Sequence, residues 1–257
     1  MRNFVVRDWL PLALRAPLWG ARERWGLSIC KDDPCWKEWQ STYLEFYAAN
    51  QRTGIGTKVN DAGYRVMSQI DLSAMRVLEI GPGDIRHVAF WQGRPREYVL
   101  ADIQAAMLHK ARQKLESAGI PSRSLLVRRD EPLPLQDMAV DIVISFYSLE
   151  HLYPLRPHVH EICRVLRPGG LLIGAIPTEG GLAWGAGRFL TSRRWLKKHS
   201  TIDPDKIICW EHPNFADQIL TELDLQFERQ FIGHWPFPWM PLLDPNLIIR
   251  LIYRKRG

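Results

Sequence analysis

Short apolar runs alternate with amphipathic stretches between residues 76 and 177 of this chain. Each run carries apolar and β-branched residues over a strand's length, and the runs cover residues 76–80 (RVLEI), 97–101 (EYVLA), 124–127, 140–145 (VDIVIS) and 171–176. Helices are expected over residues 85–91, 103–118 and 157–166, where apolar positions follow a helical period before glycine or proline. Strands that alternate with helices predict a parallel sheet with right-handed crossovers.

The flanking segments extend this fold. Residues 36–70 have aromatic side chains at helical spacing, residues 178–210 are expected to be irregular and insertion-like, and residues 214–223 are expected to form a helix. Strands over 225–231 and 246–253 would end the sheet as a hairpin-like pair. We therefore expect an α/β fold: a doubly wound, mainly parallel seven-stranded sheet with helices on both faces and an antiparallel last strand. Residues 1–70 would form an N-terminal arm and helical cap, and residues 71–257 the main domain.

Composition adds a charge pattern to this picture. The chain has 257 residues, 46% of them hydrophobic, with a net charge of +6 gathered in residues 2–24, 188–198 and 250–256. Basic patches attract nucleic acid, anionic lipid or an acidic substrate, and a merely solvated basic surface is the alternative. The four cysteines have no zinc-ligand spacing, so we expect no metal and reduced thiols typical of a cytoplasmic protein.

Residues 1–26 combine tryptophan and leucine with arginine. Such a segment can lie on a membrane surface, but Pro11 and Pro17 interrupt a long helix, which favours an arm packed on its own domain. No run of eighteen apolar residues and no signal-peptide pattern is present. We expect a cytoplasmic protein, with peripheral membrane contact through the arm as the alternative.

A glycine loop follows the first predicted strand, with the sequence EIGPGD at residues 79–84. Gly81 and Gly83 let the backbone turn tightly and approach a ligand. The dinucleotide-binding pattern would place a third glycine at position 86, where Arg86 stands, and this counts against a nucleotide-binding oxidoreductase. Asp102, at the end of the second strand, could accept hydrogen bonds from ribose hydroxyls or cap the following helix.

Three further motifs follow in order: DEPLPL at 130–135, DIVIS at 141–145 with LEHL at 149–152, and RVLRPGG at 164–170. Together with the glycine loop they resemble class I S-adenosylmethionine-dependent methyltransferases, within the type 11 group that includes quinone-biosynthesis C-methyltransferases. The resemblance covers about residues 75–177. It implies S-adenosylmethionine as cofactor, S-adenosylhomocysteine as product, and O- or C-methylation of a small-molecule or lipid-linked acceptor. A non-catalytic module that binds the same cofactor is the alternative.

The resemblance also implies roles for individual residues around the cofactor. Two departures from the family pattern suggest a wider loop: Ile85 replaces a residue that is often small, and Arg86 and His87 are unusual neighbours. The implied sites are the methionine end (Glu79, Gly81, Gly83), the ribose (Asp102), the adenine (Ile103, with Asp130 and Glu131 near its amino group) and the border of the sulfonium (Ser145, Phe146).

Candidates for catalysis lie beyond the fourth strand. His151 could act as a general base or anchor its loop, and His212 could reach the same cleft. Tyr43 and Tyr47 lie on the helix that often covers the cofactor in this family, although core packing is the simpler role. The strand end Ser145–Phe146 lacks the Asn/Asp-Pro-Pro-aromatic signature of enzymes that methylate DNA bases, so no nucleic-acid partner is expected.

The acceptor pocket is expected to come from the insert at about 178–210 and from the loop 234–240 (HWPFPWM). Apolar and aromatic lining suits a small or lipid-like molecule. The basic residues of the insert suggest an anionic acceptor as a further alternative.

Overall fold

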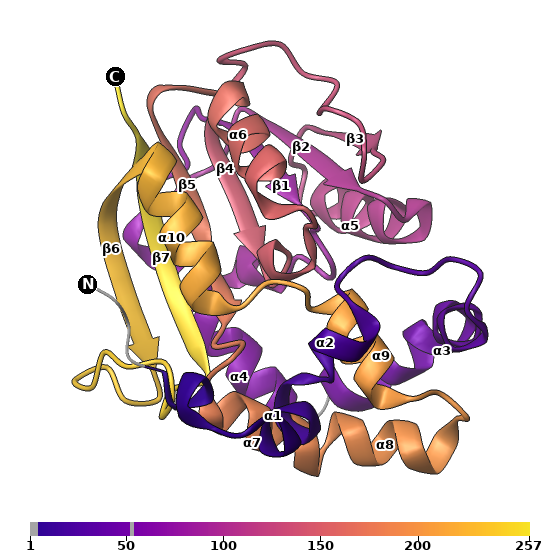
Figure 1. Cartoon of the computed structure of the whole chain (residues 1–257). Coiled ribbons are helices and arrows are strands. Elements are labelled where there is room, and N and C mark those ends of the chain that lie inside the picture. Colours follow the sequence, from indigo (N-terminus) through magenta and orange to yellow (C-terminus); the bar gives the residue numbers. More distant parts are fainter. Residues whose placement is uncertain (1–4, 52–53) are drawn as a thin grey trace.

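A seven-stranded sheet forms the centre of the computed structural model, which describes residues 5–51 and 54–257 (Figure 1). The strand order is β3-β2-β1-β4-β5-β7-β6; β1 to β5 run parallel, and β7 is antiparallel to both β5 and β6. This confirms the predicted fold, including its antiparallel end. The strands are β1 (Arg76–Ile80), β2 (Glu97–Asp102), β3 (Ser122–Leu126), β4 (Val140–Phe146), β5 (Leu166–Pro177), β6 (Phe227–Trp235) and β7 (Ile248–Lys255).

Helices connect the strands and extend the chain at its N-terminal side. They are η1 (Val6–Trp9), α1 (Leu12–Trp19), α2 (Arg22–Trp25), α3 (Pro34–Gln51), α4 (Gly54–Tyr64), η2 (Arg65–Gln69), η3 (Arg86–Phe90), α5 (Ala105–Ser117), η4 (Leu149–His151), α6 (Leu155–Val165), α7 (Leu182–Leu190), α8 (Ser192–His199), α9 (Pro204–Glu211) and α10 (Ala216–Gln226).

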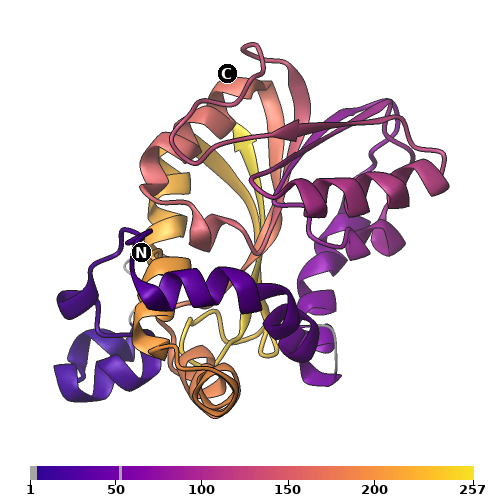
Figure 2. The same ribbon diagram turned by 90° about the vertical axis from the view of Figure 1, so that its right-hand side faces the viewer.

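Alternation along each strand divides the core into two layers. Leu78 and Val143 pack with α6 and α10, whereas Val77 and Ile144 pack with α4 and α5 on the opposite face. Figure 2 shows α6 and α10 on one side of the sheet and α5 on the other. The sheet is therefore covered on both faces, as a parallel sheet requires.

A third cluster lies away from the sheet, among α3, α8 and α9. Trp36 and Trp39 of α3 pack there against Leu196, Ile207 and Trp210 (Figure 1). The expectation of an irregular segment over 178–210 is wrong, because α7, α8 and α9 occupy most of it.

Helix α7 depends on its neighbours more than on its own sequence. It contains two glycines, which disfavour a helix, and this composition hid it from sequence reasoning. A Cβ on Gly185 would lie 2.7 Å from Nε1 of Trp19, so the glycine allows α1 to approach closely. Packing against α1 therefore stabilises a helix with low intrinsic propensity.

The N-terminal arm packs on its own domain. Trp19 is buried and its Nε1 donates to the carbonyl of Gly181 at 3.1 Å. The Arg7 guanidinium donates twice to Asp217, at 3.1 and 2.9 Å, and Arg22 donates to the carbonyl of Pro213 at 2.5 Å. Within the described parts of the chain, no helix combines the length and apolar character that a membrane crossing needs.

Candidate active site

The glycine loop after β1 adopts backbone angles that favour glycine. Gly81 and Gly83 have φ of +67° and +53°. A Cβ at Gly81 would lie 2.8 Å from Cβ of Ser148, so the loop and the end of β4 meet too closely for a side chain. Ile85 stands where the family often has a small residue, and its backbone is also left-handed (φ +45°). Its side chain is buried in the core and not at the open side of the loop.

Glu79 lies beneath this loop in a buried hydrogen-bond network. Its Oε1 is 2.8 Å from Nε2 of His87, and its Oε2 accepts from the hydroxyl of Tyr98 at 2.7 Å. The indole of Trp91 donates to Nδ1 of His87 at 2.9 Å, so Nε2 carries the proton that His87 donates to Glu79. Burial and the charge of Glu79 raise the pKa of Tyr98 well above its usual range. Glu79 is thus the hydrogen-bond partner of His87, which the unusual place of this histidine in the motif did not reveal.

Asp102 ends β2 and faces the same open space as the glycine loop. The backbone N–H of Gln104 donates to Oδ1 of Asp102 at 2.8 Å, and burial raises the pKa of this carboxyl. The helix-capping alternative is wrong as stated, because Gln104 occupies the N-cap of α5 and Asp102 stands two residues before it. Ile103 is exposed at 43% and lies beside Asp102 at the mouth of the cavity.

The remaining predicted cofactor residues separate into two groups. Glu131 and Phe146 line the cavity, Glu131 being exposed and bound by Arg128 at 2.9 Å. Asp130 is exposed and lies outside the cavity wall. Ser145 is fully buried behind the wall, and its hydroxyl lies 2.7 Å from that of Ser148, which donates to the carbonyl of Ile80.

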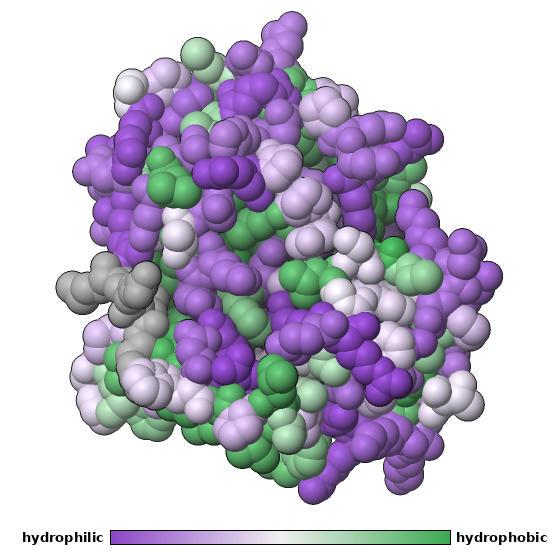
Figure 3. Space-filling view, viewed as in Figure 1, coloured by the Kyte–Doolittle hydropathy of each residue, from purple (hydrophilic) through white to green (hydrophobic). Residues whose placement is uncertain are grey.

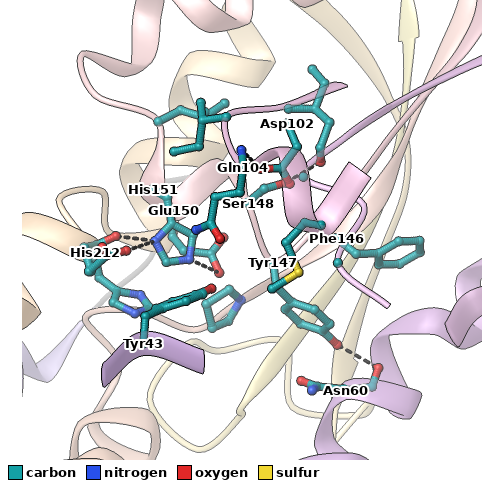
Figure 4. Close-up of a pocket in the computed structure, with 18 of the residues that line it drawn as sticks. Tyr43, Asn60, Asp102, Gln104, Phe146, Tyr147, Ser148, Glu150, His151 and His212 are labelled. Atoms are coloured by element: carbon teal, nitrogen blue, oxygen red, sulfur yellow. Dashed lines mark hydrogen bonds and ion pairs between the residues drawn. The ribbon is translucent and has the colours of Figure 1, made fainter. Parts of the chain in front are cut away.

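One cavity of about 740 Å³ joins these residues to the helical layer (Figure 4). One end is formed by the carboxyl ends of β1, β2 and β4, which is where ligands bind in open α/β sheets. The other end is lined by α3, α4, α7, α8 and α9. Tyr147 connects the two parts, because its hydroxyl donates to the carbonyl of Asn60 on α4 at 2.8 Å.

His151 and Glu211 form a dyad in this wall. Nδ1 of His151 contacts the backbone carbonyl of Glu211 and lies 3.3 Å from its carboxylate Oε2. Burial lowers the pKa of His151, but the hydrogen bond that its ring donates to Glu211 and the charges of Glu150 and Glu211 outweigh this effect, so the pKa is raised. Burial raises the pKa of the Glu211 carboxyl. The hydrogen bond from His151 and the charge of its ring outweigh this effect and lower the pKa to about 2.

His212 adjoins the dyad with a different environment. The two imidazole centroids are 4.6 Å apart, and Nδ1 of His212 lies 2.8 Å from Oε1 of Glu179. Burial, and then the charge of Arg188, lower the pKa of His212 well below its usual range. The structure therefore brings both predicted histidines together, one with a raised and one with a lowered pKa.

Glu150 completes this polar end of the cavity. Its Oε1 is 3.9 Å from Nε2 of His151, and burial raises its pKa. Glu150, His151 and His212 could hold a metal ion, because they offer ligand atoms within 4.8 Å of one another. Arg188 forms a buried ion pair with Glu179. The sequence did not reveal this pair, because both residues lie in the segment 178–210, which was expected to be irregular.

Two expectations about the acceptor end change. The loop 234–240 does not line the cavity, and its Phe237 and Trp239 are exposed at 40% and 71%, so its assignment to the pocket is wrong. The insert does line it, through Trp184, Gly187 and Arg188 among others. Tyr43 also faces the cavity, while the side chain of Tyr47 lies outside the described part of the chain.

Comparison with known proteins agrees with this architecture. Residues 78–174 match the family model described as "Methyltransferase domain". Two relatives are ubiquinone/menaquinone biosynthesis C-methyltransferases UbiE: that of Stutzerimonas stutzeri is 36% identical over 102 residues, and that of Pseudomonas aeruginosa PAO1 is 37% identical over 105 residues. The matches cover 38% and 39% of this chain and 40% and 41% of those proteins, so they span about two fifths of either length.

Solved structures share the fold at low identity. The PH0226 protein of Pyrococcus horikoshii has a TM-score of 0.57 at 18% identity, over 84% of this chain and 99% of its own. The [4+2]-cyclase SpnF has a TM-score of 0.54 at 16% identity, over 78% and 81%. Residues 78–174 are thus similar to a methyltransferase domain, and the chain shares the fold of these solved structures.

Proposed function

We propose that this protein transfers a methyl group from S-adenosylmethionine to a small or lipid-linked acceptor, by O- or C-methylation. The observation that carries the proposal is the shared cavity: Gly81, Gly83 and Asp102 open onto the same space as His151 and His212. When bound, the cofactor supplies a methyl carbon that its sulfonium makes electrophilic. A cavity that holds both the cofactor loop and a set of buried titratable groups suits a reaction between two bound molecules.

The cofactor would occupy the end formed by the parallel strands. Gly81 and Gly83 would border its methionine part, Asp102 its ribose, Ile103 and Glu131 its adenine, and Phe146 its sulfonium. The support for this fit is that Gly81, Gly83 and Asp102 line one end of the cavity. The close approach of Gly81 to Ser148 explains why a residue without Cβ stands in this loop. Glu79 and Ser145 would act indirectly by holding the loop and the end of β4, and a contact from Asp130 stays a prediction.

The acceptor would occupy the end lined by α7, α8 and α9. Oε2 of Glu150 and Nη1 of Arg188 are among the buried polar atoms there that have no hydrogen-bond partner within the described residues. A hydroxyl group can donate to the first and accept from the second. Because Arg188 is already paired with Glu179, this arrangement favours a hydroxyl-bearing acceptor over the anionic one.

The similarity to UbiE supports the same class of acceptor. Those relatives are named for ubiquinone and menaquinone biosynthesis, and we propose for this chain a ring with hydroxyl groups on a lipid tail. The protein would therefore work at the surface of the membrane that contains such lipids.

His151 is the proposed general base. Glu211 orients its ring and raises its pKa, which makes the neutral imidazole a stronger base than His212, whose pKa is lowered. Nε2 of His151 would take the proton of an acceptor hydroxyl, which would make that oxygen or the adjacent ring carbon nucleophilic toward the methyl group that the cofactor supplies. His212 would keep the hydroxyl in place as a neutral partner.

Calorimetry with S-adenosylhomocysteine tests the cofactor assignment. We expect binding of this product and none of NAD, and Asp102→Ala should weaken the binding more than tenfold because hydrogen bonds to a charged acceptor are lost. Glu116→Ala on the exposed side of α5 is the matched control and should bind like wild type. Absence of binding to the wild-type protein, or unchanged affinity in Asp102→Ala, would contradict the proposed site.

Turnover separates an enzyme from a module that only binds the cofactor, a necessary test because SpnF has this fold and is named a cyclase. Native mass spectrometry of the purified protein, incubated with S-adenosylmethionine and a set of quinols, should show a product 14 mass units heavier. His151→Asn should lower kcat by about a hundredfold with unchanged affinity for S-adenosylhomocysteine. Full turnover by His151→Asn, or turnover abolished by EDTA, would overturn the assignment of His151 as base.

A further inference from the structure

Exposed apolar side chains are concentrated on three segments at one end of the molecule. Nine of the fourteen large hydrophobic side chains that are exposed among the described residues belong to the start of the arm, α7 and the β6–β7 loop. We name them the apolar face; its members are Trp9, Leu12, Leu14, Leu182, Phe189, Leu190, Phe237, Trp239 and Leu242. In the view of Figure 1 the three segments lie along the lower edge, and Figure 3 shows hydrophobic residues gathered there. A patch of this kind on a soluble domain marks an interaction site.

Specific hydrogen bonds hold the three segments together. The carboxylate of Asp244, in the β6–β7 loop, accepts from the backbone N–H of Val6 at 2.8 Å and from that of Leu182 at 2.9 Å. The fully buried side chain of Asn246 accepts from the N–H of Phe237 and donates to the carbonyls of Met240 and Leu242, each at 2.8 Å. The loop therefore presents Phe237 and Trp239 from an ordered backbone.

Helix α7 connects this face with the cavity. Trp184, Gly187 and Arg188 line the cavity, while Phe189 and Leu190 belong to the apolar face. Helix α7 thus contributes both to the lining of the proposed acceptor site and to the apolar face.

Basic residues flank the apolar face. Helix α8 continues from α7 along the same edge in Figure 1 and exposes Arg194, Lys197 and Lys198. Residues 182–199 contain no acidic residue. Of their five lysines and arginines these three are exposed, whereas Arg188 and Arg193 are paired with Glu179 and Asp205. Aromatic and leucine side chains beside exposed cations are typical of segments that lie in the interface of an anionic bilayer, whereas cores of protein interfaces are depleted in lysine.

We propose that the apolar face docks on the surface of an anionic lipid bilayer, with Trp239, Phe237 and Phe189 among the headgroups and α8 over them. The docking itself follows from the surface alone. Its use rests on the proposed function: with α7 against the bilayer, a lipid-linked acceptor would extend from the membrane into the cavity. The apolar face is formed by three segments, so the arm is one part of it and is not a membrane anchor by itself.

Co-sedimentation of the full chain with vesicles tests the docking. Vesicles of phosphatidylcholine with 30% phosphatidylglycerol should carry down the wild-type protein, and pure phosphatidylcholine should carry down much less. Trp239→Glu with Phe189→Glu should reduce the partition at least tenfold, because apolar area is lost and charge is repelled. Lys197→Gln with Lys198→Gln should reduce it about fivefold per charge, on anionic vesicles only.

Matched controls are Leu126→Glu and Leu225→Glu, which alter exposed leucines outside the three segments. These should sediment like wild type, and all variants should keep wild-type affinity for S-adenosylhomocysteine, which shows that they fold. Equal sedimentation of the face variants and the controls would overturn the proposal. So would loss of a dimer, detected by light scattering, in the face variants without any change with vesicles, since the face would then serve a second copy of this chain. Failure of cofactor binding by the wild-type protein would instead contradict the proposed function alone.

Discussion

Glu211 holds the ring of His151 with two of its own oxygen atoms. The backbone carbonyl contacts Nδ1, and the carboxylate lies 3.3 Å away on the same side of the ring. Both acceptors require a proton on Nδ1, so Nε2 is the nitrogen left to accept one when the ring is neutral. Glu211 thereby sets the tautomer as well as the pKa of His151.

Removing the charge of Glu211 should change the titration of His151. In Glu211→Gln the hydrogen bond to a carboxylate and its charge are lost, while burial remains and lowers the pKa. We expect the pKa of His151, followed by NMR of the labelled imidazole, to fall by one unit or more. His109→Gln on α5 is the control and should leave the His151 titration where it is; an unchanged pKa in Glu211→Gln would contradict the dyad.

The same pair should make stability depend on pH. The pKa of Glu211 is lowered from 4.5 to about 2, so its contribution exists above pH 4.5 and is lost as the pH falls. The pKa of His151 is raised above 6.5, so its contribution is complete below pH 6.5 and is lost as the pH rises through the raised value. Urea unfolding should show that Glu211→Gln lowers the free energy of unfolding by about 1 kcal/mol more at pH 5.5 than at pH 9. An equal loss at both pH values would mean that the pair contributes no charge interaction.

Gly81 can be compared with a second glycine of similar backbone conformation. Gly169 has φ of +74° with nothing within 4 Å of an added Cβ, whereas a Cβ on Gly81 would meet Ser148. Gly169→Ala should cost about 1 kcal/mol of unfolding free energy through backbone strain alone. Gly81→Ala should cost more and should also weaken S-adenosylhomocysteine binding. Equal stability losses and equal cofactor affinities in the two variants would show that the contact with Ser148 is unimportant.

Trp19 should contribute far more to stability than the tryptophan at the tip of the β6–β7 loop. Its side chain is 1% exposed, so Trp19→Ala should lower the free energy of unfolding by about 3–5 kcal/mol through lost burial and a cavity. Trp239 is 71% exposed, and Trp239→Ala should change the free energy of unfolding by less than about 0.5 kcal/mol. Chemical denaturation of both variants measures the difference, and a small loss in Trp19→Ala would mean that the arm is not part of the folded core.

The sheet was predictable because local signals agreed along the chain. Residues 76–80 and 140–145 are apolar runs of strand length that precede a glycine loop and the LEHL motif, and the structure has β1 and β4 there. Asp102 was found the same way, since the end of a parallel strand is defined by where the run stops. Periodicity and turn chemistry suffice for such elements.

The helical layer was not predictable, because it depends on contacts between distant segments. Gly185 and Gly187 argue against a helix locally, and α7 depends on contacts with distant segments such as Trp19 and Asp244. The partnership of His87 with Glu79 likewise needed the fold, although the spacing of His87 and Trp91, four residues apart, was a readable signal. The loop 234–240 was misassigned because aromatic composition alone cannot tell a pocket wall from an exposed edge.

The arm's partners also determine when it can fold. Val6 bonds to Asp244, Arg7 to Asp217, Trp19 to Gly181 and Arg22 to Pro213, so each contact joins the beginning of the chain to its last third. A ribosome releases residues 5–25 before their partners in α7, α10 and the β6–β7 loop have been made. Until those segments have been made, Trp19 lacks the neighbours that bury it in the folded protein.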